Sequence, residues 1–392
     1  MSAPLHAVVA SRIFDGANVR ADMAVLIDDR LIAAIVPRAE LPTNIAVEEL
    51  PQGAWLAPGF IDIQVNGGGD SLFNDRPMPE TIRTIVAAHR RLGTTSLLPT
   101  LISDTADKMA SALAAVDTLI ESEPGVLGIH LEGPFLSPEK AGIHDKSRLR
   151  PPTAQDLAML GAVRKGVTLV TLAPERVPKL FIQKLAAAEV RVALGHSMAT
   201  YGQTRAAIAD GLTGFTHLFN AVRPLEAREP GPIGAALESP DVWYGLIADG
   251  IHVAPAMLRL ALRGAGKVIL VSDAMPPVGG SRSSYKINGE TICVREGRCA
   301  AADGTLAGAY LDLATAVRNC VRLLNVPLAD ALRFASTHPA AFLGVGDRLG
   351  RLAPGFRADM VALDGGTLEV IATWVAGAGG KTMPPVPPQP LA

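Results

Sequence analysis

The feature that most constrains the fold of this chain is a series of short apolar segments, each about 4 to 8 residues long, that alternate with stretches of helical periodicity. There are eight of them, at residues 59–66, 95–100, 126–133, 168–175, 190–197, 214–221, 243–250 and 267–274. Short apolar runs joined by amphipathic stretches are typical of parallel βα units, and eight units close a barrel. We therefore predict an α/β protein with a (β/α)8 TIM-like barrel.

The segments between the apolar runs have the periodicity of amphipathic helices. In residues 79–93, for example, Ile82, Ile85, Val86 and His89 share one face at helical spacing, and Gly93 ends the helix. After the eighth run, residues 276–311 read as a hairpin-bearing insertion. Two further helices are predicted at residues 312–324 and 327–343.

The length of 392 residues exceeds the roughly 250 of a typical barrel, which favours an additional small domain. The first fifty-odd residues and the late segments GRLAPGFRADMVALD and GTLEVIATWVAG have strand character. We predict three parts: a small β-sandwich domain from residues 1–57 and 349–381, the (β/α)8 barrel at 58–348, and an extended proline-rich tail at 382–392.

Composition excludes several classes of partner. Lys and Arg number 36 against 38 Asp and Glu, without a basic run that could follow a phosphate backbone, so no nucleic acid is expected. No apolar run approaches about 18 residues, so no membrane partner is expected. The three cysteines lack CxxC spacing, and the N-terminal segment does not have the pattern of a signal peptide. We expect a cytoplasmic enzyme.

Polar and ionisable residues gather at or just after the carboxyl ends of the predicted strands. In a barrel these ends form the active-site face. They are Gln64, Asn66, His130, Glu132, His196, His217, Asn220, Asp249, His252 and Asp273. Their recurrence on six of the strands is difficult to attribute to packing.

Three of these residues have the chemistry of a catalytic metal site. Glu132, His196 and His217 offer a carboxylate and two imidazoles from separate strands, a set that suits a divalent transition metal with an open position for water. We expect Zn²⁺, although Fe²⁺, Co²⁺ or Mn²⁺ could use the same ligands. Asp273, at the end of the last strand, could accept a proton from that water and pass it to a leaving amine.

Other histidines have simpler interpretations. His89, His6 and His338 are interpreted as structural residues of a helix face, a hairpin and a helix start. His130 precedes Glu132 by two positions, so both side chains point the same way from the strand. For His130, a structural role and a role in orienting the metal ligands both stay open.

The chain resembles the N-acetylglucosamine-6-phosphate deacetylase family along essentially its whole length up to the tail. The segments HLEGPF, LGHS and FTHLFNAV are quite specific, whereas GRLAPGFRADMVALD marks only the wider amidohydrolase superfamily. The shared segments follow in the order PGFIDIQVNG, HLEGPF, KAGIH, LAPE, LGHS, FTHLFNAV, REPG, ADGIHV, LVSDAM, GTLAG and GRLAPGFRADMVALD.

The resemblance implies a reaction in amino-sugar metabolism and a role for each matching residue. The acetamide of N-acetyl-D-glucosamine 6-phosphate would be hydrolysed to D-glucosamine 6-phosphate and acetate by metal-activated water, with Asp273 as general acid and base. Glu132, His196 and His217 would hold the metal, and His144 would hydrogen-bond the amide carbonyl. The implied substrate contacts are Ile143, His144, Asn220, Ala221, Arg228, Asp249, His252, Leu306, Ala307 and Gly308.

Two further expectations concern the metal count and the assembly. Many metal amidohydrolases carry His-x-His at the end of the first strand for a second metal, but this chain has the neutral amides Gln64 and Asn66, so we predict one ion per subunit. Arg228 suits a phosphate, with His252 as a second donor. The resemblance implies a homodimer in which Arg228 reaches the neighbouring subunit's site.

Two alternatives remain open from the sequence. Another amidohydrolase-superfamily deacylase or cyclic amidase would share the barrel and metal without the phosphate-binding residues. A catalytically silent barrel scaffold would keep the fold, but it would not need all three metal ligands and Asp273.

Overall fold

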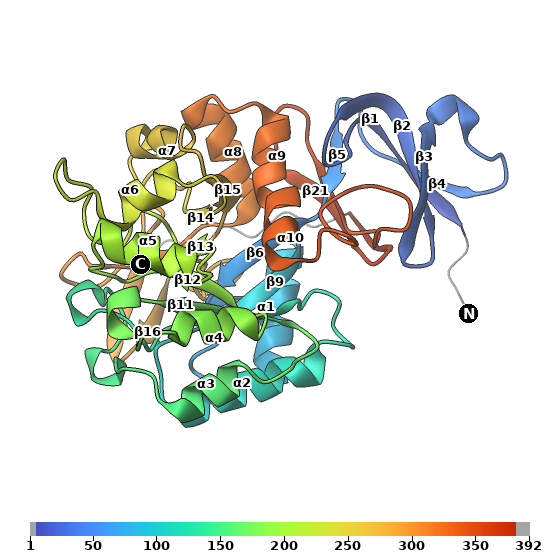
Figure 1. Ribbon diagram of the computed structural model, residues 1–392. Helices are drawn as coiled ribbons and strands as arrows, with labels where there is room; N and C mark the ends of the chain where they lie inside the picture. Colours follow the sequence, from blue (N-terminus) through green and yellow to red (C-terminus); the bar gives the residue numbers. More distant parts are fainter. Residues whose placement is uncertain (1–4, 382–392) are drawn as a thin grey trace.

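The core of the molecule is a barrel of parallel strands, seen in the computed structural model, which describes residues 5–381 (Figure 1). The strands lie side by side in the order β15-β14-β13-β12-β11-β10-β9-β6. They are β6 (Phe60–Val65), β9 (Thr94–Ile102), β10 (Gly128–Glu132), β11 (Val167–Leu172), β12 (Arg191–Leu194), β13 (Gly214–Phe215), β14 (Trp243–Leu246) and β15 (Lys267–Leu270). A parallel bridge between Val65 and Ala274 joins the last strand's extension to the first. The predicted barrel is confirmed.

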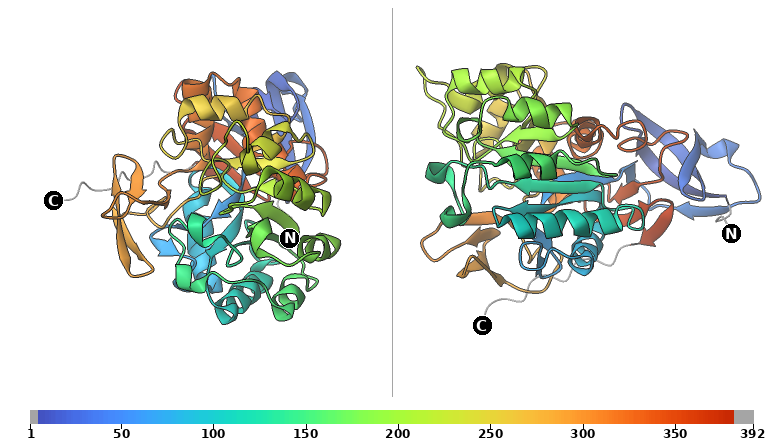
Figure 2. Two further views of the ribbon diagram at one scale, coloured as in Figure 1. Left: turned by 60° about the vertical axis from the view of Figure 1, so that its left-hand side comes forward. Right: turned by 60° about the horizontal axis from the view of Figure 1, so that its bottom comes forward.

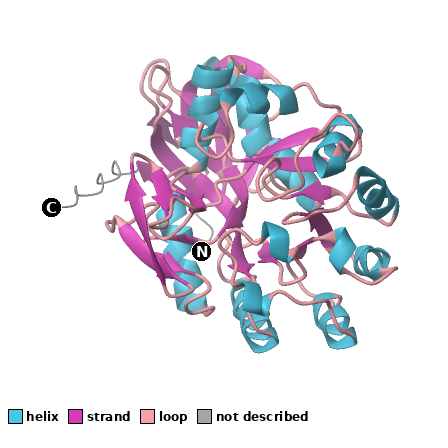
Figure 3. Cartoon of the chain, turned by 90° about the vertical axis from the view of Figure 1, so that its left-hand side faces the viewer, coloured by secondary structure: helices cyan, strands magenta, loops and turns pink. Residues whose placement is uncertain are grey.

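Helices surround the strands, as Figure 3 shows looking onto one end of the barrel. The helix α1 (Pro79–Arg90) buries the predicted face with Ile82, Ile85, Val86 and His89. The other helices of the barrel are α2 (Ala106–Leu119), α3 (Ala154–Leu160), α4 (Phe181–Ala187), α5 (Tyr201–Ala209), α6 (Gly231–Glu238), α7 (Pro255–Ala261), α8 (Leu313–Leu324), α9 (Leu328–Ala335) and α10 (Thr337–Leu343). Within the described part of the chain, no helix is both long and apolar enough to cross a membrane.

One helix prediction was wrong. The segment 327–343 forms two helices, α9 and α10, separated at Ser336. Pro339 has no N–H to donate to a carbonyl four residues earlier, and its ring would collide with that carbonyl in a continuous helix. Ser336 donates its hydroxyl to the Leu332 carbonyl at 2.7 Å and does not cap the second helix.

A second sheet packs against one end of the barrel, at the right of Figure 1, and takes strands from both ends of the chain. Its order is β22-β21-β20-β5-β1-β2-β3, with β4 pairing to β1. Its strands are β1 (His6–Phe14), β2 (Val19–Asp28), β3 (Leu31–Pro37), β4 (Ala46–Glu49), β5 (Trp55–Pro58), β20 (Met360–Leu363), β21 (Val370–Val375) and β22 (Ala378–Lys381). The exact domain boundaries stay a prediction, and the proline-rich tail at 382–392 lies outside the described residues.

The insertion after the last barrel strand is a four-stranded antiparallel sheet that flanks the mouth of the barrel (Figure 2). We call it the flanking sheet: β16 (Ser284–Ile287), β17 (Glu290–Arg295), β18 (Arg298–Ala300) and β19 (Leu306–Ala309). Asp70 accepts hydrogen bonds from the Ser281 and Arg282 backbone at its base. At the β16–β17 turn, the Asn288 amide donates to the Ile143 carbonyl at 2.8 Å. The sheet is thus fixed at both ends to barrel loops.

An ion pair between the half-buried Arg357 and the buried Asp359 joins the second sheet to the barrel. Arg357 donates from Nε to Asp359 at 2.9 Å and from Nη2 to the Ser96 hydroxyl on β9 at 2.7 Å. The same Asp359 carboxylate accepts the Ala376 N–H at 2.8 Å. Because one carboxylate serves partners from separate parts of the chain, its loss would leave several buried groups without a partner.

We expect Asp359→Ala to lower the free energy of unfolding by about 1.5–3 kcal/mol, since it removes the carboxylate partner of the half-buried Arg357 and of the buried Ala376 N–H. The measurement is urea unfolding followed by circular dichroism. Asp347→Ala is the control, because Asp347 pairs with Arg348 at 3.5 Å on the surface, where such pairs contribute about 0–1 kcal/mol. Equal losses in the two variants would contradict the structural role given to Asp359.

Candidate metal centre and active site

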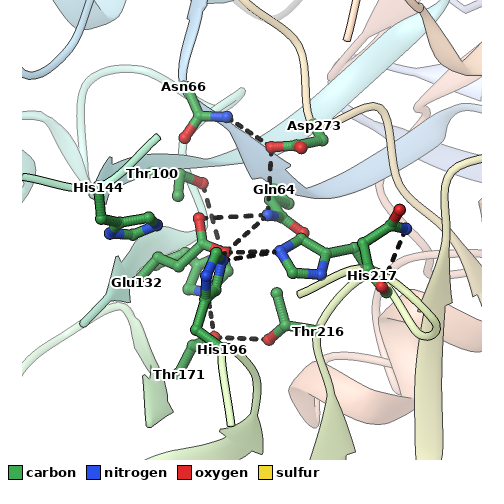
Figure 4. A network of polar contacts seen from close by, with 12 residues as sticks. Gln64, Asn66, Thr100, Glu132, His144, Thr171, His196, Thr216, His217 and Asp273 are labelled. Carbon is green, nitrogen blue, oxygen red and sulfur yellow. Dashed lines mark hydrogen bonds and ion pairs between the residues drawn. The ribbon is translucent and has the colours of Figure 1, made fainter. Parts of the chain in front are cut away.

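Three predicted ligand side chains meet at the carboxyl end of the barrel (Figure 4). Glu132 is the last residue of β10, and His196 and His217 follow β12 and β13. The Glu132 Oε1 atom lies 3.2 Å from His196 Nε2 and 3.0 Å from His217 Nε2, and the two nitrogens are 3.2 Å apart. All three residues are buried. They form a cluster that could hold a metal ion.

The cluster passes a geometric and a chemical test for a divalent ion. Two ligand atoms about 2.0–2.1 Å from one ion at tetrahedral angles are about 3.3 Å apart, close to the observed separations. The His196 Nδ1 atom lies 2.7 Å from the Lys140 carbonyl, to which only an N–H can donate, so Nε2 presents a lone pair to the cluster. Burial alone would raise the pKa of Glu132, but contacts with His196 and His217 hold it well below its usual value.

The backbone at the site is strained. His196, His217 and Asp273 have φ angles of 49°, 31° and 50°, in the left-handed region that non-glycine residues rarely adopt. Such conformations persist only where the surrounding structure fixes them, and they gather at functional sites. The turn after each of these strands therefore directs the side chain to the barrel axis.

Asp273 lies beside the cluster and is held by the two first-strand amides. Asn66 Nδ2 donates to Asp273 Oδ1 at 2.7 Å, and Gln64 Nε2 donates to the same oxygen at 3.2 Å. Gln64 also donates to both Glu132 oxygens at 3.3 Å. Burial, followed by repulsion from the Glu132 carboxylate, raises the pKa of Asp273 to about 6. A cation held by Glu132 would oppose that rise.

His144 is a neutral donor that faces the same space. The Ser103 peptide N–H donates to His144 Nδ1 at 3.3 Å, and the Ser103 hydroxyl lies 2.7 Å from the same atom. A peptide N–H can only donate, so Nδ1 accepts and the ring proton resides on Nε2. Burial, followed by repulsion from His196, lowers the pKa of His144 to about 3.

A cavity of about 310 Å³ opens over these groups. Its wall includes most of the predicted substrate-contact residues, together with an apolar side that the flanking sheet completes through Ile287. The predicted residues that line it are Asn66, Glu132, Ile143, His144, His196, His217, Asn220, Ala221, His252, Asp273, Leu306 and Gly308.

Four predicted site residues do not line the cavity. Gln64 lies beneath it, Ala307 is buried in the flanking sheet, and Arg228 is exposed on the segment between β13 and α6. Asp249 acts on His252, whose Nδ1 lies 2.6 Å from the Asp249 carboxylate. That contact leaves the other ring nitrogen of His252 for a ligand.

His130 faces the barrel interior with both ring nitrogens occupied. Nδ1 lies 3.0 Å from the Ile63 carbonyl and Nε2 lies 2.7 Å from the Thr171 hydroxyl. Burial lowers its pKa to about 4, so the ring is neutral. These contacts favour a structural role for His130 within the barrel.

Sequence reasoning missed three residues at the site. Ser103 follows β9 directly and Lys140 and Asn74 line the cavity. The strand-end pattern, applied to the second apolar run, would have indicated Ser103. Lys140 and Asn74 lie in loops that no periodicity marks.

The barrel and its cluster of a carboxylate and two imidazoles define the class of protein as an amidohydrolase. The sequence profile of the "Amidohydrolase family" matches residues 55–383, and that of the "NagA composite domain" matches residues 5–56. The N-acetylgalactosamine-6-phosphate deacetylase of Shewanella sp. (strain ANA-3) is 39% identical, with 94% of each chain covered. The N-acetylglucosamine-6-phosphate deacetylase of Haemophilus influenzae is 36% identical over 95% of this chain and 98% of its own. Within the amidohydrolases, the chain belongs to the N-acetylglucosamine-6-phosphate deacetylase family.

Solved structures agree with this assignment. The Pasteurella multocida N-acetylglucosamine-6-phosphate deacetylase superposes with a TM-score of 0.93 at 34% identity, covering 96% of this chain and 100% of that one. A mutant of the Mycobacterium smegmatis enzyme, in complex with N-acetyl-D-glucosamine-6-phosphate, superposes with a TM-score of 0.88 at 33% identity, covering 96% and 99%. This chain is accordingly a hydrolase of the amidohydrolase family.

Proposed function

We propose that the chain hydrolyses the acetamide of N-acetyl-D-glucosamine 6-phosphate to acetate and D-glucosamine 6-phosphate. The observation that carries the proposal is the convergence of Glu132, His196 and His217 beside Asp273 and His144 in one cavity. The substrate complex of the Mycobacterium smegmatis relative supports the choice of substrate.

Glu132, His196 and His217 would hold one divalent ion, and Zn²⁺ suits this ligand set. When bound, such an ion supplies a Lewis acid for the carbonyl and lowers the pKa of a water molecule to about 7. The His144 Nε2–H donates to the acetamide oxygen as negative charge develops on it. His144 is neutral, so it can stabilise that oxygen without giving up its proton.

Asp273 moves the proton between the two halves of the reaction. Gln64 and Asn66 both donate to Oδ1, and among the described residues no side chain donates to Oδ2. The carboxylate takes a proton from the attacking water and delivers it to the sugar nitrogen as the C–N bond breaks. One water is consumed, and acetate and the amine leave.

The phosphate is held by Arg228 and His252. Arg228 is exposed and forms no ion pair with a described residue, while Asp249 orients His252 with Nδ1 bound and the other nitrogen free. In a homodimer, Arg228 would reach the site of the neighbouring subunit and grip the phosphate with its planar set of donors. The enzyme would act in the cytoplasm on a sugar phosphate.

A second candidate substrate is N-acetyl-D-galactosamine 6-phosphate. The 39% identity to the Shewanella relative named for that sugar favours it. The two substrates differ only in the orientation of one hydroxyl, so both could fit one cavity at different rates.

The test follows acetate release from both sugar phosphates and from unphosphorylated N-acetylglucosamine. We expect turnover of the phosphorylated sugars, and a kcat/KM at least about 100-fold lower without the phosphate, because a charged hydrogen-bonded group contributes about 1.5–3 kcal/mol per bond. Equal rates with and without the phosphate would favour a different deacylase or cyclic amidase. Absence of turnover in metal-replete protein would favour a silent scaffold.

A further inference from the structure

The metal ligand His196 stands on a turn whose shape needs external support. Its φ of 49° is unfavourable for a residue with a side chain, and β12 has already ended at Leu194. The Lys140 carbonyl contacts Nδ1 of the ring, and the Ser137 N–H donates to the His196 carbonyl at 2.9 Å. The groups that hold the two following residues complete the support of the turn and so influence where the ring points.

Glu175 holds both of those residues. It lies in the short turn Pro174–Arg176 after β11. Its Oε1 accepts the Met198 N–H at 2.6 Å, and its Oε2 accepts the Ser197 hydroxyl at 2.7 Å. The Ser197 oxygen in turn accepts the Ala199 N–H at 3.0 Å. Hydrogen bonds to an ionised carboxylate are short and strong, so one side chain from the preceding barrel loop clamps the turn after His196.

The same turn is paired with the segment after β13. The Ser197 N–H donates to the Ala221 carbonyl at 3.2 Å, and the Arg223 N–H donates to the Ser197 carbonyl at 2.9 Å. The Arg223 side chain donates to the Met198 carbonyl at 2.9 Å from Nη2. Ala221 lines the cavity and has a φ of 49°. A change at Glu175 would thus reach both a metal ligand and the cavity wall.

We propose that Glu175 is a positioning residue that acts through Ser197 and Met198 to fix His196 for metal binding and to set Ala221 on the cavity wall. Glu175 does not line the cavity and touches neither the predicted ligand atoms nor the substrate space. The proposal rests on the proposed function, because it assigns His196 as a metal ligand. It gives a role to the acidic residue of the LAPE segment.

The test compares metal affinity in Glu175→Gln and Glu175→Ala with the wild type, using Zn²⁺ in competition with a chromophoric chelator. Residues that orient metal ligands typically raise the affinity for the metal by about 10- to 100-fold. We therefore expect the Kd for Zn²⁺ to be about 10- to 100-fold higher in Glu175→Ala than in the wild type. The Glu175→Gln variant keeps an acceptor for the Met198 N–H, so it should lose less Zn²⁺ affinity than Glu175→Ala. The visible spectrum of the Co²⁺-loaded Ala variant should shift, because the ligand geometry changes.

Asp312→Ala is the matched control for Glu175→Ala. Asp312 also accepts one peptide N–H and one hydroxyl, both from Thr315 at 2.8 Å, but it caps α8 away from the cavity. It should lower thermal stability without moving the Zn²⁺ affinity or the Co²⁺ spectrum. If Glu175→Ala does not fold, Ser197→Ala removes one arm of the clamp and should give a smaller loss in the same direction.

The results separate the two proposals. Wild-type Zn²⁺ affinity and an unchanged Co²⁺ spectrum in the folded Glu175 variants would overturn the positioning role while leaving the deacetylase reaction intact. Failure of the wild type to bind Zn²⁺, or to release acetate with bound metal, would overturn the proposed function instead. If the Glu175 variants show a higher KM with little change in kcat, Glu175 acts more through the cavity-wall residue Ala221 than through His196.

Discussion

Asp273→Asn is expected to reduce kcat by about 10²- to 10⁴-fold, the contribution typical of a positioned general acid and base. The amide has nearly the same shape as the carboxylate, and its oxygen can still accept hydrogen bonds from Asn66 and Gln64. It cannot take a proton from water or deliver one to the sugar nitrogen. Metal content should stay at the wild-type level, because Asp273 does not belong to the ligand cluster.

Steady-state acetate release and elemental analysis on the same preparation check this expectation. Asp156→Asn is the control, since it alters another buried carboxylate, which pairs with Arg150 and accepts the Thr153 N–H in the capping box of α3. It should lower stability and leave kcat within about threefold, as expected for a change outside the site. A kcat near the wild-type value in Asp273→Asn would remove this residue from the proton transfer.

The barrel could be predicted from the sequence because its strands are buried on both faces. In a strand such as β15 (Lys267–Leu270), Val268, Ile269 and Leu270 are all buried, so the strand reads as a short continuous apolar run. The metal cluster followed from the same reasoning. Parallel strands end at one face, so Glu132, His196 and His217 were expected to lie at the same end of the barrel.

Contacts made between loops could not be predicted in this way. Ser103 pairs with His144, 41 positions later in the chain, and Ile143 pairs with Asn288, 145 positions later. None of these four residues belongs to a segment with the periodicity of a helix or strand. The run 214–221 also shows the limit of hydrophobicity. Only Gly214–Phe215 is strand, because the chain then turns through the left-handed conformation at His217 to direct its imidazole inward.

Removing the divalent ion should abolish turnover almost completely. Without an ion, the contact with Glu132 raises the pKa of His217 in spite of burial, which favours a proton on the ring where the metal would otherwise bind. The water then keeps its ordinary high pKa, which a bound metal would lower to about 7. We expect kcat to fall by at least about 10³-fold after chelation and dialysis, and to recover on adding Zn²⁺ or Co²⁺. Activity that survives complete loss of metal would contradict the ligand assignment.

One equivalent of ion per chain should suffice for recovery, for a reason visible in the first strand. The Gln64 amide donates to both Glu132 oxygens and to Asp273, so its N–H groups occupy the position from which a second cation would neutralise the same carboxylates. Amide N–H groups are not metal ligands. The double variant Gln64→His with Asn66→His exchanges these donors for imidazoles and should bind a second equivalent, measured by titrating metal against activity and by elemental analysis. Two tightly bound ions in the wild type would show that Gln64 does not exclude the second site.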